Sequence, residues 1–223
     1  MSLNPREILS KTIEKVNPPE TIRCVLRKSS RYNRGEKRLT ARVWEKPPQH
    51  SRIEIMNYEV VQEPEPPDPP ARLAGLADFE SRMSLMVQNE SEIWIYNEQD
   101  REYQRIEIDA AITNRDLITF PSTLNTPFVE ESNATYEGKE FINSRLTHCL
   151  LLEPTGDADQ LYDSLSVWID EEYYWPIKVV QKYEFDDEPI IDEYKLTELS
   201  FNDPIEDARF TFTPPQDAKE KTR

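Results

Sequence analysis

Short runs in which apolar and polar residues alternate fill most of the sequence, and this period of two constrains the fold more than any other feature. In the first run, Ile22, Cys24 and Leu26 alternate with Arg23 and Arg27. Similar runs lie at residues 38–43, 52–55, 83–87, 93–96, 103–108, 141–152, 165–170, 176–185, 190–201 and 210–213. Alternation of this kind, broken by turn residues, predicts antiparallel strands with one buried face. Because a sheet of roughly ten strands is too large to stay flat, it is expected to curl. We therefore predict a mainly β (α+β) fold, in which a curved antiparallel sheet forms a half-open barrel covered by a few helices.

One amphipathic helix is predicted near the N-terminal end of the chain. Asn4 is suited to the N-cap position, Pro5 to the first helical position and Glu7 to the third. An apolar stripe follows at helical spacing, formed by Ile8, Leu9, Ile13 and Val16, and Asn17-Pro18-Pro19 ends it. We expect this stripe to lie on the sheet. Between residues 109 and 136 the alternation fails, so this stretch is expected to hold one or two short helices or a lid-like loop.

The length of 223 residues fits one domain over residues 1–215, followed by a polar tail at 216–223 that we expect to fray. A proline-rich segment at 63–70 (EPEPPDPP) interrupts the strand pattern. Because proline has no N–H to donate to a strand ladder, this segment is interpreted as an exposed insertion, either a rigid acidic spacer or a docking peptide. A short helix is expected at 72–80.

The charge balance argues against two classes of partner. The formal net charge is −16, from 43 acidic and 27 basic residues, which disfavours binding to nucleic acid or to an anionic membrane surface. No run of about 18 apolar residues occurs, so no transmembrane segment is predicted. The first residues lack the basic and apolar regions of a signal peptide, which fits either a cytosolic protein or a secreted chain whose leader has been removed.

No pattern typical of catalysis is present, so we expect that the protein is not an enzyme. The chain has four glycines and lacks a phosphate-binding loop, a dinucleotide-binding pattern, a nucleophile elbow and a zinc motif. His148 and Cys149 are neighbours on one predicted strand, so their side chains point to opposite faces and cannot form a nucleophilic pair. Cys24 and Cys149 are interpreted as core thiols, and a disulfide between them is the alternative that stays open. No metal or cofactor is predicted.

The last third of the chain carries motifs of a known family. The hairpin segments LSVWID (165–170) and WPIKV (175–179) are followed by LTELSFN (196–202) and by the ending IEDARFTFTPP (205–215). This order resembles the LolA-like superfamily of bacterial lipoprotein carriers, receptors and sorting-type proteins, which includes a related envelope-stress regulator. Upstream, Lys46-Pro47 with SRIE (51–54) is similar to the family's Arg-Pro strand, with Lys46 in place of the arginine.

The resemblance implies an eleven-strand half-open barrel closed by helices, whose apolar cavity shelters acyl chains outside the cytoplasm. The partners that it implies are lipid acyl chains or lipoproteins, and envelope proteins, and the function is that of a non-catalytic carrier or sorting factor. A protein-interaction or regulatory module of the cell envelope is the alternative. Because the pattern does not tell which strand face is concave, the candidate cavity residues come from both faces: Ile22, Cys24, Leu26, Leu39, Val43, Met83, Leu85, Val87, Trp94, Tyr96, Leu165, Val167, Trp168 and Ile169.

Overall fold

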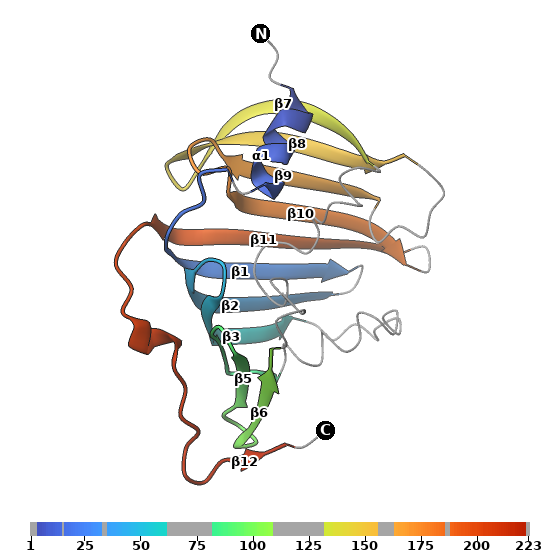
Figure 1. Ribbon diagram of the computed structural model, residues 1–223. Coiled ribbons are helices and arrows are strands. Elements are labelled where there is room, and N and C mark those ends of the chain that lie inside the picture. The colour runs from blue at the N-terminus through green and yellow to red at the C-terminus, as the bar shows by residue number, and fades with distance from the viewer. Residues whose placement is uncertain are drawn as a thin grey trace.

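A single long sheet dominates the structure, which is a computed structural model (Figure 1). The structure describes residues 4–14, 16–32, 35–61, 82–108, 132–155, 163–185 and 188–221. Within these ranges twelve strands lie side by side in the order β12-β6-β5-β4-β3-β2-β1-β11-β10-β9-β8-β7. All neighbours are antiparallel except β12 and β6, which are parallel. The predicted curved, mainly β fold is confirmed, and the sheet stays open because β7 and β12 form its two edges.

The elements follow the alternating runs of the sequence closely. In chain order they are α1 (Pro5–Ile13), β1 (Ile22–Tyr32), β2 (Gly35–Lys46), β3 (His50–Val61), β4 (Leu85–Gln88), β5 (Glu92–Asn97), β6 (Glu102–Glu107), β7 (Ser132–Ile142), β8 (Arg145–Pro154), β9 (Ser164–Asp170), β10 (Pro176–Phe185), β11 (Glu188–Phe201), the 3-10 helix η2 (Asp207–Phe210) and β12 (Lys219–Glu220).

Helix α1 begins where the sequence predicts and lies on one face of the sheet. The Asn4 side chain caps it by accepting a hydrogen bond from the Arg6 N–H at 3.0 Å. Ile8 and Leu9 are buried against an apolar cluster on β8, β9 and β10. Val16 is 40% exposed, so the predicted stripe ends one turn earlier than expected.

The two faces of the sheet follow from the cross-strand register, since directly paired residues point to the same side. We call the face that carries α1 the inner face and the opposite face the outer face. Val179 packs under α1 and pairs with Tyr194, which belongs to the apolar clusters on both halves of the sheet. Two residues along β11, Leu196 pairs with Leu26 of β1. The inner face is therefore continuous from β8 to β1 and beyond.

The segment after β11 crosses the outer face. The Phe210 ring is only 2% exposed and lies 5.4 Å from the His50 ring. Phe212 packs 5.8 Å from Trp94 and 5.6 Å from Tyr96. These aromatic contacts fasten the C-terminal segment to β3 and β5, and Figure 1 shows it descending along the sheet to β12. The prediction of a strand at 210–213 is wrong, because this segment is held by side-chain packing instead of by a ladder.

Two further predictions about the chain path are wrong. The run at 141–152 is not one strand, because Asn143 and Ser144 have φ angles of 50° and 65° and turn the chain from β7 into β8. Residues 132–136 belong to β7, although the sequence predicts irregular structure up to Tyr136. The tail is not frayed over residues 216–221, since the N–H groups of Lys219 and Lys221 donate to carbonyl oxygens of Arg101 and Tyr103 at 2.9 and 2.8 Å. This pairing adds a twelfth strand where the family resemblance implied eleven.

Three predictions fall outside the described residues. These are the proline-rich insertion at 63–70, the short helix at 72–80 and the helical or lid-like stretch over 109–131. No helix in the described part of the chain is both long and apolar enough to cross a membrane.

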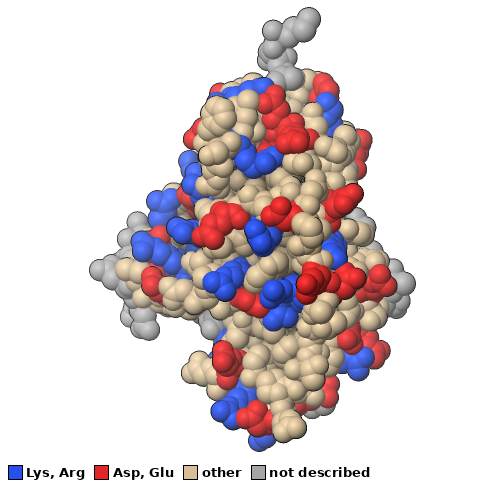
Figure 2. Space-filling view, turned by 90° about the vertical axis from the view of Figure 1, so that its left-hand side faces the viewer, with Lys and Arg blue, Asp and Glu red and all other residues tan. Residues whose placement is uncertain are grey.

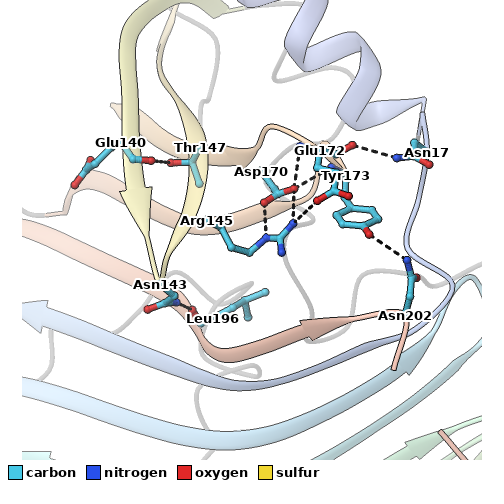
Figure 3. A network of polar contacts seen from close by, with 10 residues as sticks. All are labelled: Asn17, Glu140, Asn143, Arg145, Thr147, Asp170, Glu172, Tyr173, Leu196 and Asn202. Atoms are coloured by element: carbon cyan, nitrogen blue, oxygen red, sulfur yellow. Dashed lines mark hydrogen bonds and ion pairs between the residues drawn. The ribbon is translucent and has the colours of Figure 1, made fainter. Parts of the chain in front are cut away.

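A polar network joins the strand ends near the β7–β8 turn (Figure 3). The Arg145 guanidinium donates to both oxygens of Asp170, at 2.6 Å from Nε and 3.1 Å from Nη2, and to Glu172 at 3.2 Å. The same guanidinium lies over the Tyr173 and Phe201 rings, 5.4 and 4.8 Å from their centroids. Because Asp170 is 1% exposed, this bidentate pair is a buried connection between β8, the β9–β10 turn and the end of β11.

Candidate ligand-binding site

Apolar side chains cross the inner face from strand to strand. One row pairs Cys24 with Val43, Val43 with Ile53, Ile53 with Met86 and Met86 with Ile95, and thus runs over β1, β2, β3, β4 and β5. The first four of these residues are at most 4% exposed. An uninterrupted apolar row of this length is the kind of surface that retains an aliphatic ligand by area burial.

A recess lies on this face near Ile22, at the start of β1. Its enclosed space is about 10 Å³, which is room for about one water-sized sphere. The lining residues come from β1, β2, β11 and the β9–β10 turn: Ile22, Cys24, Leu26, Val43, Glu45, Trp175 and Leu196. Because pockets for small molecules typically measure ~300–1,000 Å³, an acyl chain can enter only if some of the lining side chains move.

Two polar groups lie inside this recess. Glu45 is 7% exposed, and its carboxylate is part of an otherwise apolar wall. The Cys24 thiol is 4% exposed, and burial, with a smaller contribution from the Glu45 charge, raises its pKa far above the ordinary value. Because the thiolate is the nucleophilic form, burial disfavours the reactive form of Cys24.

A second polar group of the inner face lies farther along the same strands. Gln181, Asp192 and Ser30 are neighbours in one cross-strand row, and all three are buried. Asp192 is 9% exposed; its Oδ2 accepts a hydrogen bond from the Tyr183 hydroxyl at 3.2 Å, whereas its Oδ1 has no hydrogen-bond partner within the described ranges. A buried carboxylate oxygen without a partner is available to a donor group of a ligand.

The structure separates the candidate cavity residues into two sets. Those on or against the inner face are Ile22, Cys24, Leu26, Leu39, Val43, Met83, Leu165, Val167 and Ile169. Of these, the recess brings together Ile22, Cys24, Leu26 and Val43. Leu165, Val167 and Ile169 instead pack under α1.

The remaining candidates point to the outer face. They are Leu85, Val87, Trp94, Tyr96 and Trp168, as their cross-strand partners show. Phe212 covers Trp94 and Tyr96, and the Trp168 indole donates to Glu140 at 2.7 Å with the Lys178 ammonium 4.4 Å above its ring. Lys46 is also on this side, where it forms an ion pair with Asp207 and lies over the Phe210 ring.

Sequence reasoning missed three residues of the recess. Glu45 follows Val43 by two positions, so the period of two already places it on the same face. Leu196 is signalled by the alternation of β11, but a β-bulge near Glu198 shifts the register there. Trp175 lies in a turn, and only the tertiary structure brings it to this wall.

His148 and the remaining thiol, Cys149, are both buried. His148 is 3% exposed, its Nδ1 lies 3.4 Å from the Tyr136 hydroxyl, and burial lowers its pKa below the ordinary value. Burial also raises the pKa of the Cys149 thiol, to about 12, and both cysteines are free. In the part of the chain that the structure describes, no group of three or more His, Cys, Asp or Glu side chains could hold a metal ion.

Comparison with known proteins shows the fold. No family model matches the chain. The uncharacterised protein MJ0687 of Methanocaldococcus jannaschii is 27% identical over 135 residues, which are 60% of this chain and 37% of that protein's length.

Solved structures match over nearly the whole chain. An uncharacterised conserved protein from Thermus thermophilus is 14% identical with a TM-score of 0.55, and the match covers 98% of both chains. MucB is 11% identical with a TM-score of 0.52, over 95% of this chain and 64% of MucB. A LolA superfamily protein from Nitrosomonas europaea matches more distantly, at 15% identity and a TM-score of 0.38 over 95% of this chain and 99% of that one. The long, open, helix-poor antiparallel sheet of this chain therefore has the same fold as the Thermus thermophilus protein and MucB.

Proposed function

We propose that this protein is a non-catalytic, extracytoplasmic binder of lipid acyl chains or lipoproteins, which it holds on the inner face of the sheet. The observation that carries the proposal is the continuous apolar inner face, which includes the recess where apolar side chains of β1, β2 and β11 meet. The resemblance of the sequence to the LolA-like superfamily supports the same function, because that superfamily includes lipoprotein carriers and sorting-type proteins.

The energetics of such a site suit reversible capture. Each buried CH₂ group contributes about 0.8 kcal/mol, so roughly ten of them gain about 8 kcal/mol. Loss of translational and rotational freedom on association costs at least ~4 kcal/mol. The balance of at most about 4 kcal/mol corresponds to weak, millimolar affinity, from which the ligand is readily released.

The polar group around Asp192 supports a particular orientation of the ligand. Asp192 lies four residues from Leu196 on β11, which is roughly 13 Å along an extended strand. An acyl chain in the recess could therefore reach Asp192 Oδ1 with a hydroxyl or ammonium donor at its polar end. This arrangement favours ligands with a donor in the headgroup over free fatty acids, whose carboxylate would be repelled.

The first experiment is native mass spectrometry, with lipid extraction, on protein purified from cells. A co-purifying lipid mass that disappears after delipidation is expected. If the protein retains no lipid and does not bind a fluorescent fatty-alcohol probe, the proposal is refuted and the protein-interaction alternative is left.

A pair of variants tests the place of binding. Val43→Phe fills the recess from its wall, so it is expected to weaken probe binding by about tenfold or more. Val25→Phe makes the same change at a buried position of the neighbouring strand on the outer face, and is expected to change affinity less than twofold. Thermal unfolding of both variants separates lost binding from lost folding.

A further inference from the structure

Basic side chains stand in one row on the outer face of the sheet. Lys178 of β10 pairs directly with Lys195 of β11, and Lys195 pairs with Arg27 of β1. Arg42 of β2 continues the row, because it pairs with Val25, two residues before Arg27. Directly opposed Cβ atoms lie about 4.5–5.5 Å apart, so like charges in these positions repel one another. We call Lys178, Lys195, Arg27 and Arg42 the cationic ridge.

Part of this charge is not neutralised within the protein, because Glu54, which directly opposes Arg42 on β3, forms its ion pair with Arg52. Arg27, Arg42 and Lys195 form no ion pair with any other residue in the described ranges, and Arg27 and Arg42 are exposed. Lys178 is 3.8 Å from Glu193, at the outer limit of an ion pair. The ridge thus concentrates repelling charges at the centre of a sheet, where apolar or paired side chains would be more stable.

The ridge is also exceptional for this chain. Acidic residues outnumber basic ones by 43 to 27, yet the cations gather on adjacent strands. Figure 2 shows several Lys and Arg side chains at mid-height, interspersed with Asp and Glu, at the level at which Figure 1 places β11, β1 and β2. The C-terminal segment makes its aromatic contacts on the outer face with His50, Trp94 and Tyr96 of β3 and β5, so these contacts lie to one side of the ridge.

We propose that the cationic ridge is a docking site for an acidic segment of a partner protein, on the face of the sheet opposite the apolar recess. An extended peptide with an acidic residue at every second position presents its carboxylates on one side, about 6.8 Å apart. Such a row can face the ridge while the guanidinium groups of Arg27 and Arg42 donate to it. This would place recognition of a protein partner and retention of an apolar ligand on separate faces.

The net charge of −16 decides between an acidic peptide and larger polyanions. Nucleic acid and anionic membranes extend well beyond the ridge, so they also meet the acidic remainder of the surface. A short peptide contacts only the ridge, and charges farther away than about 8–10 Å are largely screened at physiological salt. Charge complementarity therefore favours the short acidic segment.

The test is fluorescence anisotropy with a labelled peptide of alternating Glu and Ser, and with a Lys-Ser peptide of the same length. The wild-type protein is expected to bind the Glu-Ser peptide at least about tenfold more tightly than the Lys-Ser peptide, with affinity that falls as salt rises. The double variant Arg27→Glu/Lys195→Glu is expected to lose about tenfold or more in affinity for the Glu-Ser peptide and to gain affinity for the Lys-Ser peptide. The gain distinguishes reversed recognition from a misfolded protein.

A matched control carries the same change of net charge elsewhere. Lys219→Glu/Lys221→Glu alters β12 and the residue after it, at the edge of the sheet, and should keep the affinity within about twofold of wild type. Equal binding of both peptides, an unchanged affinity of the ridge variant, or tighter binding to single-stranded DNA or to phosphatidylglycerol vesicles would each overturn the proposal. Because no apolar ligand is involved, failure here leaves the lipid-binding proposal standing, and failure of lipid binding leaves this one standing.

Discussion

Loss of the Arg145 guanidinium should destabilise the protein far more than loss of an exposed arginine. In Arg145→Met the Asp170 carboxylate, whose side chain is 2% exposed, would keep its charge without its cationic partner. Removing one partner of a buried ion pair costs about 3–5 kcal/mol, because the other charge stays desolvated. Two backbone N–H groups, of Glu172 and Tyr173, still donate to Asp170 Oδ1 at 3.1 and 2.9 Å, and the Arg145 side chain is itself 26% exposed. We therefore expect about 3 kcal/mol, at the lower end of that range.

Urea and thermal unfolding measure this loss directly. For a chain of this size, about 3 kcal/mol corresponds to a fall in Tm of about 6–12 °C. Arg23→Met is the matched control, since Arg23 pairs with Asp203 at 3.3 Å and both side chains are about half exposed, at 57% and 48%. The control should cost less than about 1 kcal/mol. If the two variants lose the same free energy of unfolding, the reasoning from burial is refuted.

Three further outcomes follow from burial elsewhere in the sheet. Phe210→Ala should cost about 3–5 kcal/mol in urea unfolding, while Phe141→Ala, at a ring that is 69% exposed, should cost less than about 0.5 kcal/mol; similar costs would show that the C-terminal segment is not fastened by Phe210. Because burial holds the pKa of His148 below 6.5, the unfolded state binds the proton more readily, so stability should fall as the pH drops from 6.5 towards the folded value. In His148→Gln the free energy of unfolding should depend less on pH over this range. An unchanged pH dependence would show that His148 is not its source. Cys24 and Cys149, with raised pKa values, should resist a thiol reagent at pH 8 in the native protein and both react in denaturant.

Much of the fold could be predicted because strand patterning is local. The alternation at Ile22, Cys24 and Leu26 indicates that these residues share one face, whichever strands lie beside this one. Asn4 and Pro5 likewise specify the start of α1 through the hydrogen bonds of its first turn. The β7–β8 turn was not predictable in the same way, because Asn143-Ser144 lacks the glycine that usually marks two consecutive positive φ angles.

The candidate site was only half predictable for a related reason. An alternating pattern shows which residues share a face, but it does not tell which face is covered by a helix. Trp94 and Tyr96 share a pattern with the recess residues, yet they lie under Phe212, more than a hundred positions later in the chain. Trp175 reaches the recess only through the turn that precedes β10.

The sequence by itself determined the strands, their two-faced character and the capped N-terminal helix, because backbone hydrogen bonding and side-chain alternation act over a few neighbouring residues. The tertiary structure decided which face became the inner one. It did so by placing α1 on Leu150 and Val167 and the C-terminal segment on the opposite side. It also decided that Lys178, Lys195 and Arg27 stand side by side, since register between strands that are distant in the chain follows from long-range packing, which no local pattern records.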